Sequence, residues 1–114
     1  MVAKGRYIPR RGHVVWVDFD PVRGHEQRGK RPAMIVSSEK YNAKSGLALA
    51  CPITSRAKGY PFEVSLTTKA MTGVILVDQI RSIDWSQRRA KKMGSASEKT
   101  IADVQNLLKK LITD

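Results

Sequence analysis

Residues Val14–Val36, VVWVDFDPVRGHEQRGKRPAMIV, contain two short apolar segments joined by a charged loop. The apolar segments include several β-branched residues, which are typical of strands. Gly24 and Gly29 bound the charged part of the loop, and glycines let a backbone approach a ligand closely. Pro32 then favours an extended conformation for the residue before it. The stretch therefore predicts a strand, a ligand-binding loop and a second strand.

Further apolar segments follow at short intervals, separated by residues that tolerate turns. Among these segments only Phe62–Leu66 alternates apolar with polar residues, so the other segments are expected to be buried on both faces. A series of short strands in 114 residues predicts a small barrel or strongly curled sheet. The predicted strands are Val14–Phe19, Ala33–Val36, Leu47–Ile53, Phe62–Leu66 and Val74–Ile80, with turns at 20–21, 42–46, 58–61 and 72–73.

The last part of the chain predicts one amphipathic helix. Its apolar residues recur at helical intervals at Ile101, Val104, Leu108 and Leu111. Ser97 is a candidate N-cap, and Ser95 with Glu98 has the spacing of a capping box, so either serine could begin the helix. We expect this helix to pack against the sheet, with contact between part of its apolar stripe and a second subunit as the alternative. By length, residues 1–114 predict a single domain.

The chain is strongly basic. It has 21 Lys and Arg against 10 Asp and Glu, a formal net charge of +11. Such an excess favours polyanionic partners, with nucleic acid as the first candidate, although a solvated surface of lysines would give the same composition. Residues 97–114 have no net charge, so the basic surface belongs to the body of the fold.

The lone Cys51 lies in an apolar segment without a neighbouring His or cation, so we expect it to be core rather than a nucleophile. A single cysteine cannot form an intrachain disulfide, which fits a reducing compartment. The sequence has no apolar segment of about 20 residues and no signal-peptide core at its N-terminus. We therefore expect a cytoplasmic protein that does not contact a membrane.

The charged loop has the side chains that phosphoester chemistry needs. Arginines hold phosphate oxygens as planar forks, and Glu26 and His25 are candidate proton carriers. His13 and His25 are the only histidines, and no Asp, Glu or His cluster has metal-ligand spacing, so neither a metal nor a cofactor is expected. Without a metal, RNA still offers its own nucleophile, the 2′-hydroxyl. A His13 and His25 acid–base pair is an alternative that depends on their proximity in the fold.

Two further residues are singled out by position. Pro32 holds Arg31 at the start of a strand, where a restrained guanidinium would clamp a phosphate better than a mobile one; a solvated cation is the alternative. Thr54 lies at the end of a buried strand, where its hydroxyl could bind a phosphate oxygen or bond the local backbone. Aromatic residues could stack on bases, although aromatics in a small barrel more often belong to the core. The candidates are Trp16, Phe19, Tyr60 and Trp85.

A set of short motifs occurs in order along nearly the whole chain. In these motifs the chain resembles the MazF/PemK family of toxin endoribonucleases, and its MazF members most closely. The motifs are Tyr7-Ile8-Pro9, Trp16–Pro21, Gly24-x-Glu26-Gln27, Arg31-Pro32-Ala33, Tyr41-Asn42, Pro52-Ile53-Thr54, Lys58–Val64 and Val77–Ile83.

This resemblance implies a mainly β fold with some helix: a small SH3-like curled barrel, of the kind shared by CcdB and PemK toxins, plus the C-terminal helix. It implies a homodimer that cleaves single-stranded messenger RNA at selected sequences and arrests growth. It also implies a MazE-like antitoxin with a flexible acidic segment, through which the complex would bind operator DNA.

The resemblance also assigns roles to residues. It implies that Arg31 and Thr54 are catalytic and that Glu26 supports base action or substrate placement. We expect the remaining candidates to contact RNA, with an uncertain role for His25 because family members vary there. These RNA-binding candidates are His25, Gln27, Arg28, Lys30, Ser55, Arg56, Lys58 and Gln79.

Two other functions remain open at this point. SH3-like barrels also serve as binding modules without chemistry, since a fold alone does not determine function. A gyrase-poisoning toxin on a related barrel is the second alternative, which the Arg31 and Thr54 match disfavours.

Overall fold

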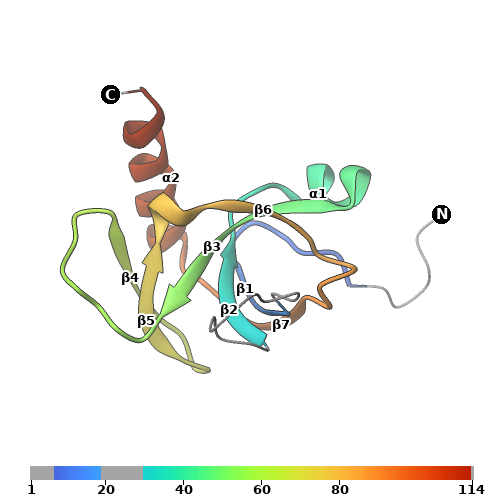
Figure 1. Cartoon of the computed structure of the whole chain (residues 1–114), viewed down its shortest axis with the longest axis horizontal. Helices are drawn as coiled ribbons and strands as arrows, with labels where there is room; N and C mark the ends of the chain where they lie inside the picture. The colour runs from blue at the N-terminus through green and yellow to red at the C-terminus, as the bar shows by residue number, and fades with distance from the viewer. Residues whose placement is uncertain (1–6, 19–29, 114) are drawn as a thin grey trace, which may run out of the picture.

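The computed structural model describes residues 7–18 and 30–113. Within these residues the chain forms an antiparallel sheet with a short helix and a long C-terminal helix (Figure 1). The elements are β1 (His13–Asp18), β2 (Lys30–Ile35), α1 (Glu39–Ser45), β3 (Leu47–Thr54), β4 (Glu63–Thr67), β5 (Thr72–Leu76), η1 (Val77–Gln79), β6 (Arg81–Asp84), β7 (Lys91–Ser95) and α2 (Glu98–Thr113).

The sheet is organised around β3, which pairs with three other strands. The main strand order is β4-β5-β3-β2-β1-β7. The first half of β3, Leu47–Ala50, pairs with β6, and its last residues, Ile53 and Thr54, pair with β5. Because β3 changes partner along its length, the sheet curls into a half-barrel, as the sequence predicts (Figure 1).

The central strands are buried on both faces, which explains why their sequences are apolar at successive positions. One layer packs under α2, β4 and β5, and the other lies under β6 and the segment before β1. The first layer contains Val14, Met34, Val36, Cys51, Ile53, Leu66, Ile75, Val77 and Val104. The second contains Val15, Val17, Ala33, Ile35, Ala48, Ala50, Ile83 and Trp85.

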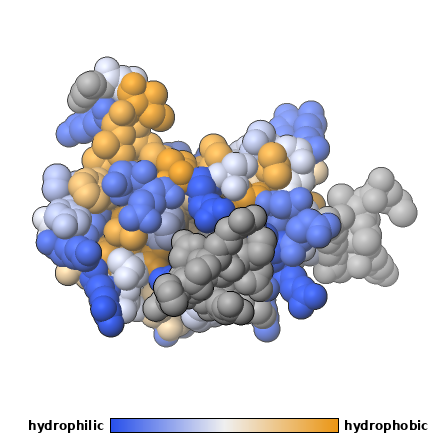
Figure 2. Space-filling model, in the orientation of Figure 1, coloured by the Kyte–Doolittle hydropathy of each residue, from blue (hydrophilic) through white to orange (hydrophobic). Residues whose placement is uncertain are grey.

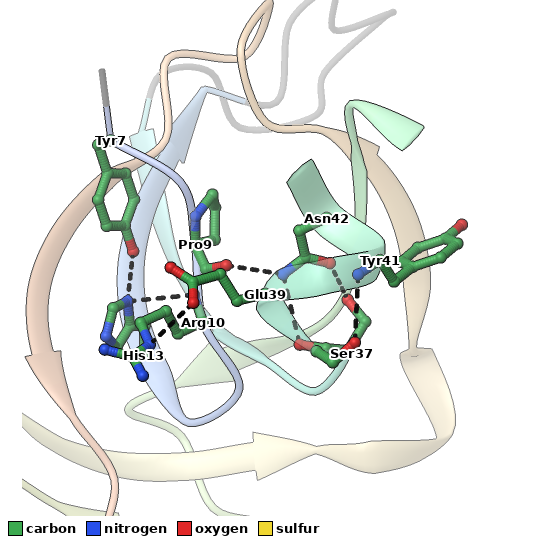
Figure 3. Close-up of polar contacts among 9 residues, drawn as sticks. Tyr7, Pro9, Arg10, His13, Ser37, Glu39, Tyr41 and Asn42 are labelled. Atoms are coloured by element: carbon green, nitrogen blue, oxygen red, sulfur yellow. Dashed lines mark hydrogen bonds and ion pairs between the residues drawn. The ribbon is translucent and has the colours of Figure 1, made fainter. Parts of the chain in front are cut away.

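The turn expected at residues 42–46 is instead the second part of a short helix that contains a buried asparagine. There the chain forms α1, capped by Ser38 at its start and by Gly46, with φ of 75°, at its end. The Asn42 side chain is fully buried and donates to the carbonyl of Pro9 at 2.8 Å, while it accepts a hydrogen bond from the Ser37 hydroxyl (Figure 3). The prediction was wrong because the bond from Asn42 to Pro9, which lies 33 residues away, helps to stabilise the helix and has no signal in the local sequence.

Other boundaries also differ from the sequence prediction. The expected strand Val74–Ile80 is β5 followed by the single turn of η1, and β6 and β7 were not predicted as strands. The predicted C-terminal helix is confirmed as α2, and the amide of Thr100 donates to the Ser97 hydroxyl, so Ser97 is the N-cap. In residues 7–18 and 30–113 we find no helix with the length and apolar character needed to cross a membrane.

Candidate nucleic-acid interface

Arg31 and Thr54 lie at the same end of the sheet. Arg31 belongs to β2, opposite Val17 of β1, and Thr54 ends β3, opposite Val74 of β5. The last pair between β2 and β3 is Ala33 opposite Pro52, and Arg31 and Thr54 each lie two residues beyond this pair. Since side chains alternate between faces along a strand, both residues also share one face.

Two prolines mark the point where β2 and β3 stop pairing. The paired residues run from Ile35 to Ala33 in β2 and from Ala50 to Pro52 in β3. Neither Pro32 nor Pro52 has an amide proton, so neither can extend this ladder as a donor. Arg31, the residue before Pro32, belongs to strand β2 and is partly buried.

The Thr54 hydroxyl has one local partner and a proton left to donate. Its oxygen accepts a hydrogen bond from the Arg56 amide at 3.2 Å. A hydroxyl combines one donor with two acceptor positions, so this bond leaves the Thr54 proton available. The local turn and a phosphate contact, which were competing interpretations of the sequence, are thus compatible.

A pocket of about 350 Å³ adjoins Thr54 and gathers several residues proposed from the sequence. Thr54, Arg56, Lys58 and Gln79 all line it, although Arg56 and Lys58 follow β3 and Gln79 ends η1. Ser55 is exposed and does not line it. The remaining wall consists of Tyr60, Phe62, Glu63, Leu76 and Asp78.

The β3–β4 loop has a well-defined conformation. The carboxylate of Glu63 accepts hydrogen bonds from the amides of Lys58 and Gly59 at 3.1–3.2 Å. Gly59 has φ of +77°, which favours glycine over residues with a side chain. The sequence analysis did not assign a role to Glu63. The available signal was its position four residues after Gly59 and five after Lys58, within reach of the amides of that turn.

The aromatic candidates separate by burial. Trp85 is only 5% exposed and its indole donates to the carbonyl of Asn42, so it is a core residue and the stacking hypothesis is wrong for it. Trp16 and Tyr60 are 37% and 48% exposed. The rings of Tyr60 and Phe62 stack with centroids 5.0 Å apart. Phe19 lies outside the described residues.

Most of the charged loop also lies outside the described residues. The predictions for His25, Glu26, Gln27 and Arg28 therefore remain predictions. The backbone of Lys30 is described and lies opposite Asp18 in the pairing of β1 with β2.

His13 lies at the far end of β1 from the residue opposite Arg31. Its Nδ1 accepts a hydrogen bond from the Tyr7 hydroxyl at 2.7 Å, and the two rings stack (Figure 3). Burial, followed by the positive charges of Lys92 and Arg10, lowers the pKa of His13. These contacts give His13 a structural role at the start of the strand.

The chemistry of the site depends on cations, hydroxyls and amides. No group of three or more His, Cys, Asp or Glu side chains is placed to hold a metal ion among residues 7–18 and 30–113. Cys51 is fully buried, and burial raises its pKa to about 12, so the predicted core role is confirmed. The fold and this strand-end site define a class of protein: a small half-barrel whose site presents the cations, hydroxyls and amides that suit a phosphodiester.

Comparisons with known proteins identify the family. Residues 10–112 match the family described as PemK-like, MazF-like toxin of type II toxin-antitoxin system. The chain is 44% identical over 107 residues to the endoribonuclease toxin MazF of Escherichia coli (strain K12), covering 94% of this chain and 96% of that protein. The chain therefore belongs to the PemK/MazF toxin family, as the sequence resemblance indicated.

Solved structures agree with this assignment. The crystal structure of MazF from Deinococcus radiodurans superposes with a TM-score of 0.85 at 47% identity, covering 96% of this chain and all of that one. A MazE–MazF structure from the same organism matches with a TM-score of 0.87 at 48% identity, covering 94% and 97%. The predicted curled barrel with a C-terminal helix is confirmed.

Proposed function

We propose that this protein is the toxin of a type II toxin–antitoxin system and that it cleaves single-stranded RNA, chiefly messenger RNA, without a metal ion. The observation that carries the proposal is the placement of Arg31 and Thr54 on one face at one end of the sheet, in a chain with net charge +11. The family and the named endoribonuclease relatives support the same activity.

The proposed reaction uses the 2′-hydroxyl of RNA as nucleophile. Its oxygen forms a bond to the adjacent phosphorus while the bond from phosphorus to the 5′-oxygen breaks. The 2′-hydroxyl proton passes to a general base, and the leaving 5′-oxygen receives a proton. The products are a 2′,3′-cyclic phosphate and a free 5′-hydroxyl.

Arg31 would stabilise the negative charge that develops on the phosphate. A guanidinium has a pKa above about 12, so charge stabilisation suits it better than proton transfer. The Thr54 hydroxyl would donate its remaining proton to a phosphate oxygen. Glu26 would assist as base or by placing the substrate, while Arg56 and Lys58 would contact the RNA backbone.

The test is a cleavage assay on mixed-sequence RNA in excess chelator, with analysis of fragment ends. We expect discrete fragments with 2′,3′-cyclic phosphate and 5′-hydroxyl ends. A substrate with 2′-deoxyribose before the scissile bond should bind but resist cleavage. Arg31→Ala and Thr54→Ala should each lower the single-turnover rate by roughly two orders of magnitude or more while the protein stays folded.

The same assay discriminates the alternatives. A binding module would shift RNA and leave it intact, and a gyrase-poisoning toxin would cause DNA damage with intact messenger RNA. Products with 5′-phosphate ends, or normal rates in a folded Arg31→Ala variant, would contradict the proposed mechanism.

The proposal includes two protein partners. An apolar groove lies between α2 and the residues around η1, with Leu49, Leu108 and Leu111 in its lining. A second copy of the chain would cover this groove, and an antitoxin with a flexible acidic segment would lie along the basic RNA-binding surface. MazE–MazF structures of similar proteins support a partner of this kind. The complex would bind operator DNA through the antitoxin. A messenger RNA substrate supports a cytoplasmic location for the activity.

A further inference from the structure

The pocket beside Thr54 has walls of different chemistry. Tyr60 and Phe62 supply an aromatic wall, and Asp78 and Gln79 supply a polar wall. Thr54 belongs to the same lining. A flat, partly apolar molecule with a polar edge would match these surfaces, and an unpaired nucleobase is such a molecule.

The aromatic wall is exposed where a base could stack. Tyr60 stacks on Phe62 with ring centroids 5.0 Å apart, and Tyr60 nevertheless has 48% of its surface exposed. An isolated surface tyrosine would lose side-chain entropy on stacking with a ligand. Here Phe62 already supports the ring, so less entropy is lost when a base binds.

Backbone hydrogen bonds hold the two walls together. The Val77 amide donates to the Phe62 carbonyl at 3.2 Å, which joins the start of η1 to the residue before β4. The Glu63 carboxylate binds the Lys58 and Gly59 amides on the other side of Tyr60. The aromatic and polar walls are therefore positioned before any ligand enters.

The polar wall has unused hydrogen-bonding groups. Asp78 and Gln79 are both exposed, and their side chains form no hydrogen bond or ion pair with the described part of the chain. A carboxylate only accepts hydrogen bonds, whereas an amide both donates and accepts. The wall thus presents more acceptors than donors to a base edge.

From this geometry we infer that the pocket is a subsite for the base adjacent to the scissile phosphate, and that Asp78 selects bases with an exocyclic amino group. This inference rests on the proposed function. Tyr60 stacks on the base, Asp78 accepts from its amino group, and Gln79 bonds a neighbouring edge atom. Adenine, cytosine and guanine all have such an amino group; uracil has carbonyl oxygens at the corresponding positions and is disfavoured by the carboxylate.

The test is sequencing of the 5′ ends produced from a randomised RNA pool, with wild type and variants of the polar wall. Wild type should disfavour uracil at one position flanking the cut by roughly tenfold or more. Asp78→Asn should reduce that discrimination to about threefold or less, because an amide can also donate to a carbonyl oxygen. Other positions of the cleavage motif should keep their preferences.

Matched variants separate base recognition from charge and stacking. Asp103→Asn makes the same change in net charge, at a helix residue paired with Lys99, and should leave the motif unchanged. Tyr60→Ala should raise KM roughly tenfold, and Tyr60→Phe, which keeps an aromatic ring for stacking, should bring KM back toward the wild-type value. Asp78 also borders the apolar groove, so sedimentation of Asp78→Asn should show the wild-type mass.

Binding of short oligonucleotides with 2′-deoxyribose at the cut distinguishes failure of this inference from failure of the proposed function. If wild type binds uracil-containing oligonucleotides more weakly and Asp78→Asn removes this difference, the subsite is supported. This holds even if wild type cuts no RNA, and in that case only the proposed function fails. Cleavage by Asp78→Asn with the wild-type preference at every position would overturn the subsite and leave the proposed function standing. A wild-type preference for uracil that depends on Asp78 would overturn it as well.

Discussion

His13 shows how one residue can couple the fold to pH. Its Nδ1 accepts hydrogen bonds from the Tyr7 hydroxyl and, at 3.3 Å, from the Arg10 amide, so this nitrogen carries no proton. Burial raises the pKa of Tyr7 to about 12, which keeps the phenol protonated as the donor. Burial, Lys92 and Arg10 lower the pKa of His13, and Glu39 opposes them.

We expect the folded state to lose stability as the pH falls below the ordinary histidine pKa of 6.5 and through the lowered pKa of folded His13. The unfolded chain binds the proton more readily in that window, so the free energy of unfolding is highest above it. Urea unfolding at pH 7.5 and pH 5.0 measures the loss. His13→Gln keeps an acceptor for Tyr7 but cannot be protonated, so its loss should be smaller; an equal loss in both proteins would contradict this role.

At the scale of elements, the close approach of β5 to β3 positions Thr54. Gly73 in β5 lies so near β3 that a Cβ atom there would come within 2.7 Å of the Thr54 carbonyl oxygen. Val74, the next residue, pairs with Thr54. The sequence predicted a turn at this glycine, whereas the structure uses it to bring two strands together at the candidate catalytic residue.

Gly73→Ala should therefore disturb the site through the backbone. The added methyl group must push β3 and β5 apart at Thr54, at a cost of roughly 1–3 kcal/mol in the free energy of unfolding. We expect at least a tenfold loss of cleavage in the folded variant. Gly94→Ala is the matched control in β7, since its Cβ would be 3.7 Å from the nearest atom of Thr68, an ordinary contact. Equal activity of the two variants would argue against this coupling.

At the scale of the whole molecule, α2 leaves apolar surface uncovered. A groove of about 400 Å³ lies between its second half and the residues around η1, and Figure 2 shows apolar surface running from the end of this helix onto the body. Leu49, Leu111 and Ile112 line it and are 38%, 49% and 80% exposed. Apolar surface gathered in this way favours association with a second copy of the chain.

Leu111→Lys combined with Ile112→Lys should convert the protein to a monomer, because it places two charges in the proposed interface. Sedimentation at micromolar concentration should give the dimer mass for wild type and half of it for the double variant. Lys109→Ala changes an exposed residue of the same helix that does not line the groove and should remain dimeric. A monomeric wild type would contradict the proposed homodimer.

Periodicity in the sequence was sufficient for the curled sheet and its closing helix, but not for β6, β7 or α1. Apolar segments of strand length, a helical stripe ending in Leu111 and the Ser97 cap depend on neighbours within a few residues, so the curled sheet and α2 were predicted correctly. Where the outcome depended on distant partners, prediction failed. Helix α1 relies on Asn42 bonding Pro9, which is 33 residues away. The burial of Trp85, by contrast, agrees with the core role that aromatics in a small barrel usually have.

The sequence by itself determined the basic charge, the curled sheet of short strands with its closing helix, the core role of Cys51 and, through ordered motifs, the family with Arg31 and Thr54 as candidates. Only the tertiary structure decided that these two residues share one face, because strand register is set by pairing over long separations. It also decided that Tyr60 lines a pocket with Asp78 and Gln79, since the pairing of β4 with β5 brings the β3–β4 loop beside η1. Charge, strand and helix periodicity and capping can be predicted from neighbouring residues, whereas a functional site depends on contacts between residues far apart in the chain.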